Sequence, residues 1–240
     1  TSANGNIDDG VTFADICYSS NPSYTNVPDD NFEQALINLG YDDTLDDYVL
    51  TANISGVTSL DVNNEGISDL TGIEAFIALT NLECNNNQLT SLDVSANTAL
   101  SNLWFWENQL TTLDVGSNTA LISLRCWNNQ LTSLDVSANT ALTHLECASN
   151  PLTSLDVSSN TALTHLYCNN NQLTSLDVSS NTALTFLECY NNQLTSLDVS
   201  SHTALTELYC NDNQLTSLNV SNNTALEVLH LDDNQLTSLD

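Results

Sequence analysis

Leucine recurs every 21 residues through most of this chain, at Leu79, Leu100, Leu121, Leu142, Leu163, Leu184, Leu205 and Leu226. One unit, residues 163–183, reads LTHLYCNNNQLTSLDVSSNTA and contains two short alternating segments, LYC and LDV. Alternation of period two predicts β-strands, and the intervening Asn, Gln, Ser and Thr predict turns. A repeat of this length predicts a solenoid, because stacked coils bury leucine columns that a single coil cannot bury.

The repeats set the boundaries of the array. Seven full units cover residues 79–225, and an eighth unit, residues 226–240, is partial. A 22-residue unit precedes them at 57–78, so we expect one solenoid over 57–240.

The region before the array is expected to hold a small helical cap over residues 28–56, preceded by an extended lead-in over 1–27. The segment PDDNFEQALINLG has the apolar spacing of an amphipathic helix. Asp30 and Glu33 have capping-box spacing, and Gly40 supplies a stop signal. This helix is predicted to cover the first coil.

The spacing LxxLxCxxNxLxxLDVxxN, which runs unit by unit over 79–240, resembles the 21-residue, IRREKO-type class of bacterial leucine-rich repeats. Residues 57–78, VTSLDVNNEGISDLTGIEAFIA, are similar to an internalin-type repeat. The resemblance implies a leucine-rich repeat solenoid, mostly β, with one or two short parallel strands per coil. It also implies protein interaction or adhesion through the concave face, at a secreted or cell-surface location.

Two repeat positions are expected to build the interior. The sixth holds Cys84, Phe105, Cys126, Cys147, Cys168, Cys189, Cys210 and Leu231. Cysteine in an apolar slot behaves as a small hydrophobe, so we expect free buried thiols in this column. Cys17 lies outside the array and is expected to be unpaired. The ninth position is Asn in every unit, which predicts a ladder of hydrogen bonds to buried backbone.

Acidic residues gather in one column and in the cap. The fifteenth position holds Asp93, Asp114, Asp135, Asp156, Asp177, Asp198, Asn219 and Asp240. Stacked like charges repel, so we expect hydrogen bonds from neighbouring Ser and Thr, with a weak calcium ladder as the alternative. A second calcium candidate comprises Asp42, Asp43, Asp46 and Asp47, although their segment lacks the Gly and terminal Glu of a calcium loop. Otherwise no cofactor is expected.

The third, fifth and seventh positions vary between units and are expected to point outward. They carry seven of the eight aromatic residues (Phe, Trp and Tyr) found from Leu79 onward, and all three Trp lie with the chain's only Arg on two adjacent strands. Clustered aromatic residues around a charge are typical of binding surfaces. We predict a ligand-binding face comprising Trp104, Trp106, Arg125, Trp127, Glu146, Tyr167, Phe186, Tyr190 and Tyr209.

Two alternatives concern the same columns. The Trp side chains could serve only to cover the strands. His144 and His165, one coil apart with Glu146 nearby, could instead hold zinc or copper.

Composition excludes several functional classes. One basic residue against 30 acidic residues gives a net charge of −29, so no phosphate-neutralising surface for nucleic acid can form. No apolar run is long enough for membrane insertion. No nucleophile and base stand out at unique positions, and no phosphate-cradling Gly loop is present, so we do not expect an enzyme.

The sequence therefore predicts a non-enzymatic, extracellular recognition or adhesion module that binds a protein or glycan on its aromatic face. One alternative is a structural cell-surface spacer stabilised by calcium. Another is an ice-binding solenoid that presents Thr columns such as Thr132, Thr153 and Thr174. Because the last unit is incomplete, we expect the natural protein to continue and the uncapped end to support a homodimer.

Overall fold

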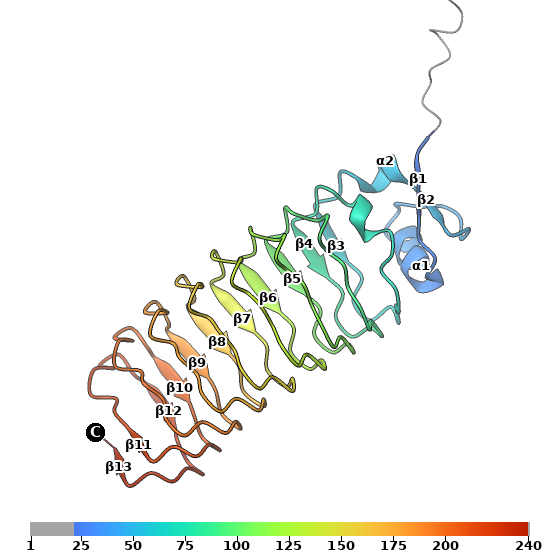
Figure 1. Ribbon diagram of the computed structural model, residues 1–240. Coiled ribbons are helices and arrows are strands. Elements are labelled where there is room, and N and C mark those ends of the chain that lie inside the picture. The colour runs from blue at the N-terminus through green and yellow to red at the C-terminus, as the bar shows by residue number, and fades with distance from the viewer. Residues whose placement is uncertain (1–21, 240) are drawn as a thin grey trace, which may run out of the picture.

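A computed structural model describes residues 22–239 as an elongated solenoid with a cap at its N-terminal end (Figure 1). A parallel nine-stranded sheet runs along one side and confirms the predicted architecture. Each coil contributes one short strand to it, in the order β3 (Ser59–Asp61), β4 (Asn81–Glu83), β5 (Asn102–Trp104), β6 (Ser123–Arg125), β7 (His144–Glu146), β8 (His165–Tyr167), β9 (Phe186–Glu188), β10 (Glu207–Tyr209) and β12 (Val228–His230).

The repeat length sets the register of this sheet. Leu145 of β7 pairs with Leu166 of β8, exactly one unit later in the sequence, and the other 21-residue units pair in the same way. Leu60 pairs with Leu82 because the first unit has 22 residues. Each repeat position therefore becomes a column along the solenoid.

The LDV half of the coil forms no strand through most of the described array. Only the last two coils pair there, through β11 (Ser217–Leu218) and β13 (Ser238–Leu239). The residues after the Val form a tight turn, as where the Asn160 N–H bonds the Val157 carbonyl at 2.9 Å. Most coils therefore have one strand and one tight turn.

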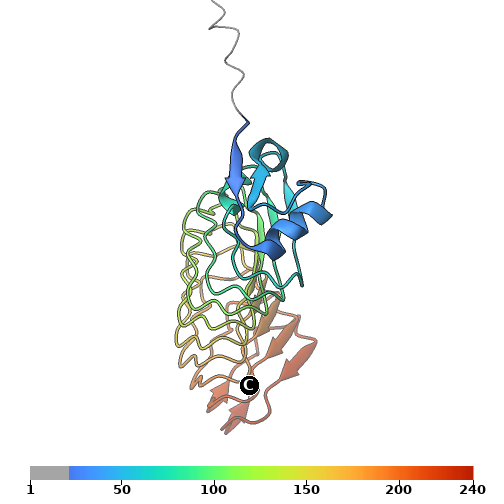
Figure 2. The same ribbon diagram turned by 90° about the vertical axis from the view of Figure 1, so that its right-hand side faces the viewer.

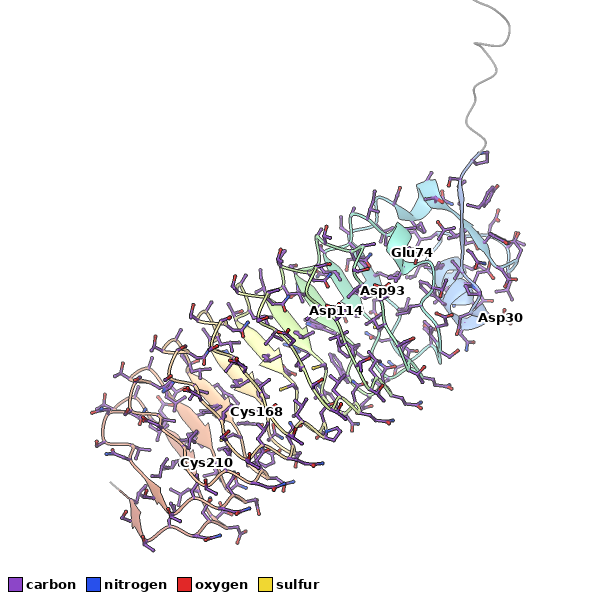
Figure 3. All side chains as sticks on the ribbon, in the orientation of Figure 1. Asp30, Glu74, Asp93, Asp114, Cys168 and Cys210 are labelled. Atoms are coloured by element: carbon purple, nitrogen blue, oxygen red, sulfur yellow. The ribbon has the colours of Figure 1, made fainter. Side chains whose placement is uncertain are left out.

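The interior consists of apolar columns. The first and fourth Leu of each unit, the Val of LDV and the sixth-position residue are buried over most of the array. Cys84, Cys126, Cys147, Cys168, Cys189 and Cys210 are all free and buried, which confirms the prediction, and Figure 3 labels two of them. Burial raises the pKa of the Cys147 thiol to about 12, so this thiol stays protonated at neutral pH. Cys17 lies outside the described residues.

The predicted Asn ladder at the ninth position is confirmed. The Asn171 amide donates to the carbonyls of Cys147, Cys168 and Asn169 at 3.1, 3.1 and 3.2 Å. Its Oδ1 accepts the Leu152 N–H at 3.1 Å. One side chain thus satisfies backbone groups of its own coil and of the preceding coil.

A second ladder occupies the nineteenth position and was not predicted, although Asn stands there in every full unit but one. Its members are Asn97, Asn118, Asn139, Asn160, Asn181, His202 and Asn223. The Asn160 amide donates to the carbonyls of Val136 and Asn139 at 3.0 and 2.9 Å. The solenoid is therefore tied along two lines of buried side-chain hydrogen bonds.

The cap combines two strands and two helices. β1 (Tyr24–Asn26) pairs antiparallel with β2 (Tyr48–Leu50), while α1 (Asp30–Asn38) and α2 (Thr51–Ile54) complete it at the N-terminal end of the solenoid (Figure 2). Phe32 of α1 packs against Phe76, with ring centroids 6.4 Å apart, next to the 3₁₀-helix η1 (Ile73–Ala75). None of the helices within residues 22–239 combines the length and apolarity of a membrane span.

The N-cap predicted for α1 was wrong by one residue. Asp29 caps the helix, because its Oδ1 accepts the N–H groups of Asn31 and Phe32 at 3.0 and 3.1 Å. Its Oδ2 accepts the N–H and hydroxyl of Ser68 at 2.8 and 2.7 Å. Asp30 is exposed. Contacts with the first coil therefore select between the two adjacent Asp residues.

The other two signals of this helix had different outcomes. Glu33 does not reach back to the cap residue; it accepts the N–H groups of Asp46 and Tyr48, both at 3.0 Å. Gly40 is confirmed as the stop, with φ of 79° and its N–H bonded to the Ile37 carbonyl. The buried Glu33 thus holds the loop between α1 and β2.

Candidate functional site

The outer side of the nine-stranded sheet, called the strand face from here on, carries the third, fifth and seventh positions of each unit. The predicted binding residues all lie there and are half-buried. Six belong to strands, namely Trp104 on β5, Arg125 on β6, Glu146 on β7, Tyr167 on β8, Phe186 on β9 and Tyr209 on β10. Trp106, Trp127 and Tyr190 follow β5, β6 and β9 by two residues.

The three Trp and Arg125 form one tryptophan cluster, as predicted. The rings of Trp104 and Trp106 have centroids 6.2 Å apart, and Trp106 stacks on Trp127 at 5.6 Å and 8°. The Arg125 guanidinium carbon lies 4.6 Å from the Trp104 ring centroid, and Arg125 Nε lies 3.2 Å from Glu146 Oε1. A cation between an indole and a carboxylate is held by both contacts.

A second group of rings, the aromatic stack, continues along the third and fifth columns from β7 to β12. His144 and His165 stack at 4.4 Å and 12°, and His165 continues onto Phe186 at 5.9 Å. Phe186 and Tyr209 lie 5.7 Å apart, and Tyr209 meets His230 at 4.9 Å. The sequence prediction missed these His residues as part of the aromatic surface, although their column positions placed them there.

Carboxylates outnumber cations on the strand face. Arg125–Glu146 is the one ion pair found within residues 22–239. Burial raises the pKa of Glu188, and the charges of Glu207 and Glu146 raise it further. Burial also raises the pKa of Glu146, against the opposing effect of Arg125. The face therefore carries half-buried negative charge that one Arg does not compensate.

His144, at the start of the aromatic stack, has a lowered pKa and is less basic than free imidazole. Burial lowers the pKa of His144, and the charges of His165 and Arg125 lower it further. Thr143 Oγ1 lies 2.9 Å from His144 Nδ1 and fixes the ring. Among residues 22–239, no group of three or more His, Cys, Asp or Glu is arranged to hold a metal ion.

The acidic column is hydrogen-bonded, as expected, and Figure 3 labels two of its members, Asp93 and Asp114. Asp156 Oδ1 accepts the backbone N–H of Ser158 at 2.9 Å, and its neighbours do the same two residues on. The hydrogen bonds from the Ser158 backbone and side chain lower the pKa of Asp156. The column therefore caps turns in each coil.

Two of the cap carboxylates in the predicted calcium site accept hydrogen bonds from residues near them in the sequence. Asp46 Oδ1 accepts the Tyr48 N–H at 3.1 Å, and Asp43 accepts a neighbouring hydroxyl at 3.0 Å. Asp42 is half-buried, and burial raises its pKa, although a backbone hydrogen bond opposes the rise. Asp47 is exposed, with φ of 69°. Calcium binding here stays a prediction.

Comparisons with known proteins all find leucine-rich repeat proteins. The family described as Leucine Rich repeats (2 copies) matches residues 161–202. Internalin J of Listeria monocytogenes serotype 4b (strain F2365) is 44% identical over 71 residues, covering 30% of this chain and 8% of that protein. A structure described as the functional domain of InlJ, which includes a cysteine ladder, has a TM-score of 0.86 and 42% identity and covers 91% of this chain. The chain is a leucine-rich repeat solenoid and is similar to the internalins of Listeria monocytogenes.

A further internalin has the same fold. Internalin C2 of Listeria monocytogenes is 24% identical with a TM-score of 0.75, and the match covers 89% of this leucine-rich repeat protein and 94% of that chain. The leucine-rich repeat protein spans 50% of the solved InlJ chain and matches 8% of curated internalin J. Its own column of free Cys is similar to the cysteine ladder described for InlJ.

Proposed function

We propose that this leucine-rich repeat protein is a non-enzymatic recognition or adhesion module, secreted or at the cell surface, that binds a protein or glycan through its strand face. The two groups of stacked aromatic side chains on the outward columns, the tryptophan cluster and the aromatic stack, carry this proposal. The inward columns are nearly invariant, because the fold restricts them. The outward columns are free to vary, and large rings have accumulated there.

The chemistry of the tryptophan cluster supports recognition. When a partner covers the half-exposed indoles, the removal of their apolar surface from water favours binding. Their flat faces suit sugar rings or aromatic and aliphatic side chains, and Arg125 adds directional hydrogen bonds beside them. Buried Trp and Arg residues are the usual centres of binding energy in interfaces.

The test begins with a screen of the wild-type protein against an array of glycans and an array of extracellular proteins. Each ligand found is measured again with the Trp104→Ala/Trp106→Ala variant by surface plasmon resonance. We expect its affinity to fall by about tenfold or more, because each hot-spot residue contributes over ~1 kcal/mol.

The matched control removes two large exposed side chains elsewhere. Tyr24 and Ile77 are 60% and 65% exposed and lie outside the predicted face, so Tyr24→Ala/Ile77→Ala should bind as wild type does. Both variants are checked by circular dichroism and thermal unfolding. Equal affinity of the tryptophan variant and wild type, with folding intact, would contradict the proposal.

The alternatives make different predictions. A calcium-stabilised spacer requires calcium-dependent unfolding and indifference to the tryptophan substitutions. An ice-binding solenoid requires thermal hysteresis, which a freezing-point measurement detects. The predicted homodimer requires twice the monomer mass in light scattering.

A further inference from the structure

A hollow of about 250 Å³ opens on the strand face beside the tryptophan cluster. Small residues form it: Ala148 and Asn169 occupy the seventh position on two successive coils, between Trp127 and Tyr190 in the same column. At the strand spacing of ~4.8 Å, Trp127 and Tyr190 are about 14 Å apart along the axis. The two rings therefore wall the hollow at its ends.

The fifth column closes one side of the hollow with Glu146, Tyr167 and Glu188. Glu146 already contacts Arg125, whereas no ion pair or hydrogen bond is found for the Glu188 carboxylate within residues 22–239. Glu188 is half-buried, and its pKa is raised by burial and by neighbouring carboxylates. A bound cation would relieve this uncompensated negative charge.

The lining of the hollow contains a further acceptor without a donor. Asn169 is only 5% exposed, and its buried Oδ1 has no hydrogen-bond partner. A buried amide oxygen left unpaired costs ~1–3 kcal/mol, so this atom favours a ligand that brings an N–H. Tyr190 is held beside it, because the Asn170 amide contacts its hydroxyl at 3.5 Å.

Deepening the proposed function, on which it rests, we infer that this hollow receives the basic side chain of a protein partner, an Arg or a Lys. Aromatic walls attract a cation through their faces, and Glu188 pairs with it. Once the Asn169 side chain turns toward the hollow, its unpaired Oδ1 accepts one of the N–H groups of the cation. The volume lies below the ~300–1,000 Å³ of small-molecule sites, which suits one inserted side chain.

A net charge of −29 attracts any cation weakly to the whole surface. The test must therefore distinguish binding in the hollow from this non-specific attraction. The probes are Nα-acetyl-arginine methylamide and Nα-acetyl-lysine methylamide, titrated at 150 mM NaCl. Nα-acetyl-citrulline methylamide is the neutral analogue of the arginine probe. The readout is the NMR shift of the Ala148 methyl group and the Trp127 indole, which line the hollow.

We expect at least one basic probe to shift these signals with a dissociation constant on the order of 1 mM, and the citrulline probe to shift them far less. Glu188→Gln should weaken binding by about fivefold or more, because it removes the charge and keeps the shape. The matched control is Glu83→Gln, which changes the same fifth column outside the hollow and should bind as wild type does.

Three results would overturn the inference: no shift with either basic probe, equal shifts with citrulline, or equal losses in Glu188→Gln and Glu83→Gln. Its failure is distinguishable from failure of the proposed function. If the binding of a partner depends on Trp104 and Trp106 but not on Glu188, the proposed binding face is supported and the role of the hollow is contradicted. If binding depends on none of these three residues, both proposals are contradicted.

Discussion

Single side chains at the ninth position tie neighbouring coils together. Each buried Asn makes up to four hydrogen bonds to the backbone. The Asn171 amide, for example, donates to three carbonyls, and its oxygen accepts the Leu152 N–H. Because a buried group that loses its partner pays the full desolvation cost, these residues should matter far more than their exposed neighbours.

Asn171→Ala is therefore expected to lower the free energy of unfolding by roughly 3 kcal/mol or more, since it leaves several buried backbone groups unpaired. Urea denaturation followed by circular dichroism measures this loss. The control is Gln172→Ala, at an exposed neighbouring position, which should stay within about 0.5 kcal/mol of wild type. Equal midpoints for the two variants would show that the ladder contributes nothing.

The roles of single residues could be predicted from the sequence where one residue type repeats at the same position of each unit. The ninth-position Asn and sixth-position Cys were predictable because every coil repeats the same environment. The hollow was not, because it depends on how larger side chains on neighbouring coils pack around Ala148. Such details are set by packing between different residues on successive coils.

Among the elements, the cap joint rests on one carboxylate shared by α1 and the first coil. Asp29 accepts two N–H groups of the helix and three donors from Ser68 and Asp69. Burial opposes ionisation of Asp29, but these hydrogen bonds outweigh it and lower its pKa below the ordinary 3.8. The adjacent Asp30 gave an equally good sequence signal, and only the first coil distinguishes the two.

A lowered folded-state pKa means that Asp29 contributes stability above the unfolded-state value of 3.8, and that this contribution is lost as the pH falls through the folded-state pKa. Asp29→Asn should cost roughly 1–3 kcal/mol at pH 7, because an amide N–H₂ then faces the Ser68 and Asp69 donors.

The difference between wild type and Asp29→Asn should shrink as the pH is lowered from 6 towards and below 3.8, as measured by urea denaturation at each pH. Asp30→Asn is the matched control, because it removes the same charge at the exposed neighbouring position. A pH-independent difference would mean that the Asp29 charge has no part in the joint.

For the whole molecule, charge repulsion is the main destabilising feature that solution conditions can change. A net charge of −29 with one Arg leaves the stacked carboxylates to repel one another over the ~30 Å Debye length of 0.01 M salt. Raising NaCl from 10 to 300 mM should increase the melting temperature by about 2–4 °C, which corresponds to ~1 kcal/mol for a chain of this size.

The same experiment separates screening from specific calcium binding. NaCl and CaCl₂ at equal ionic strength should raise the melting temperature by similar amounts if screening acts alone. A clearly larger rise in CaCl₂ that saturates at low millimolar concentration would support the cap site at Asp42, Asp43, Asp46 and Asp47 or the acidic column. At this scale the 21-residue period predicted the solenoid, and the resemblance to leucine-rich repeats implied the parallel strands that the structure has.

The register of the sheet has a consequence for how such a chain can change its length. Removing any 21 consecutive residues within the 21-residue units joins two coils whose columns still align, whereas removing 20 or 22 there shifts the columns by one position and sets Leu against polar residues such as Gln, Thr and Asp. Insertions or deletions of whole coils therefore keep the columns of the 21-residue units aligned. Losing one coil between Trp127 and Tyr190 would bring those rings about 4.8 Å closer, so the number of coils adjusts the spacing between binding groups without altering the fold.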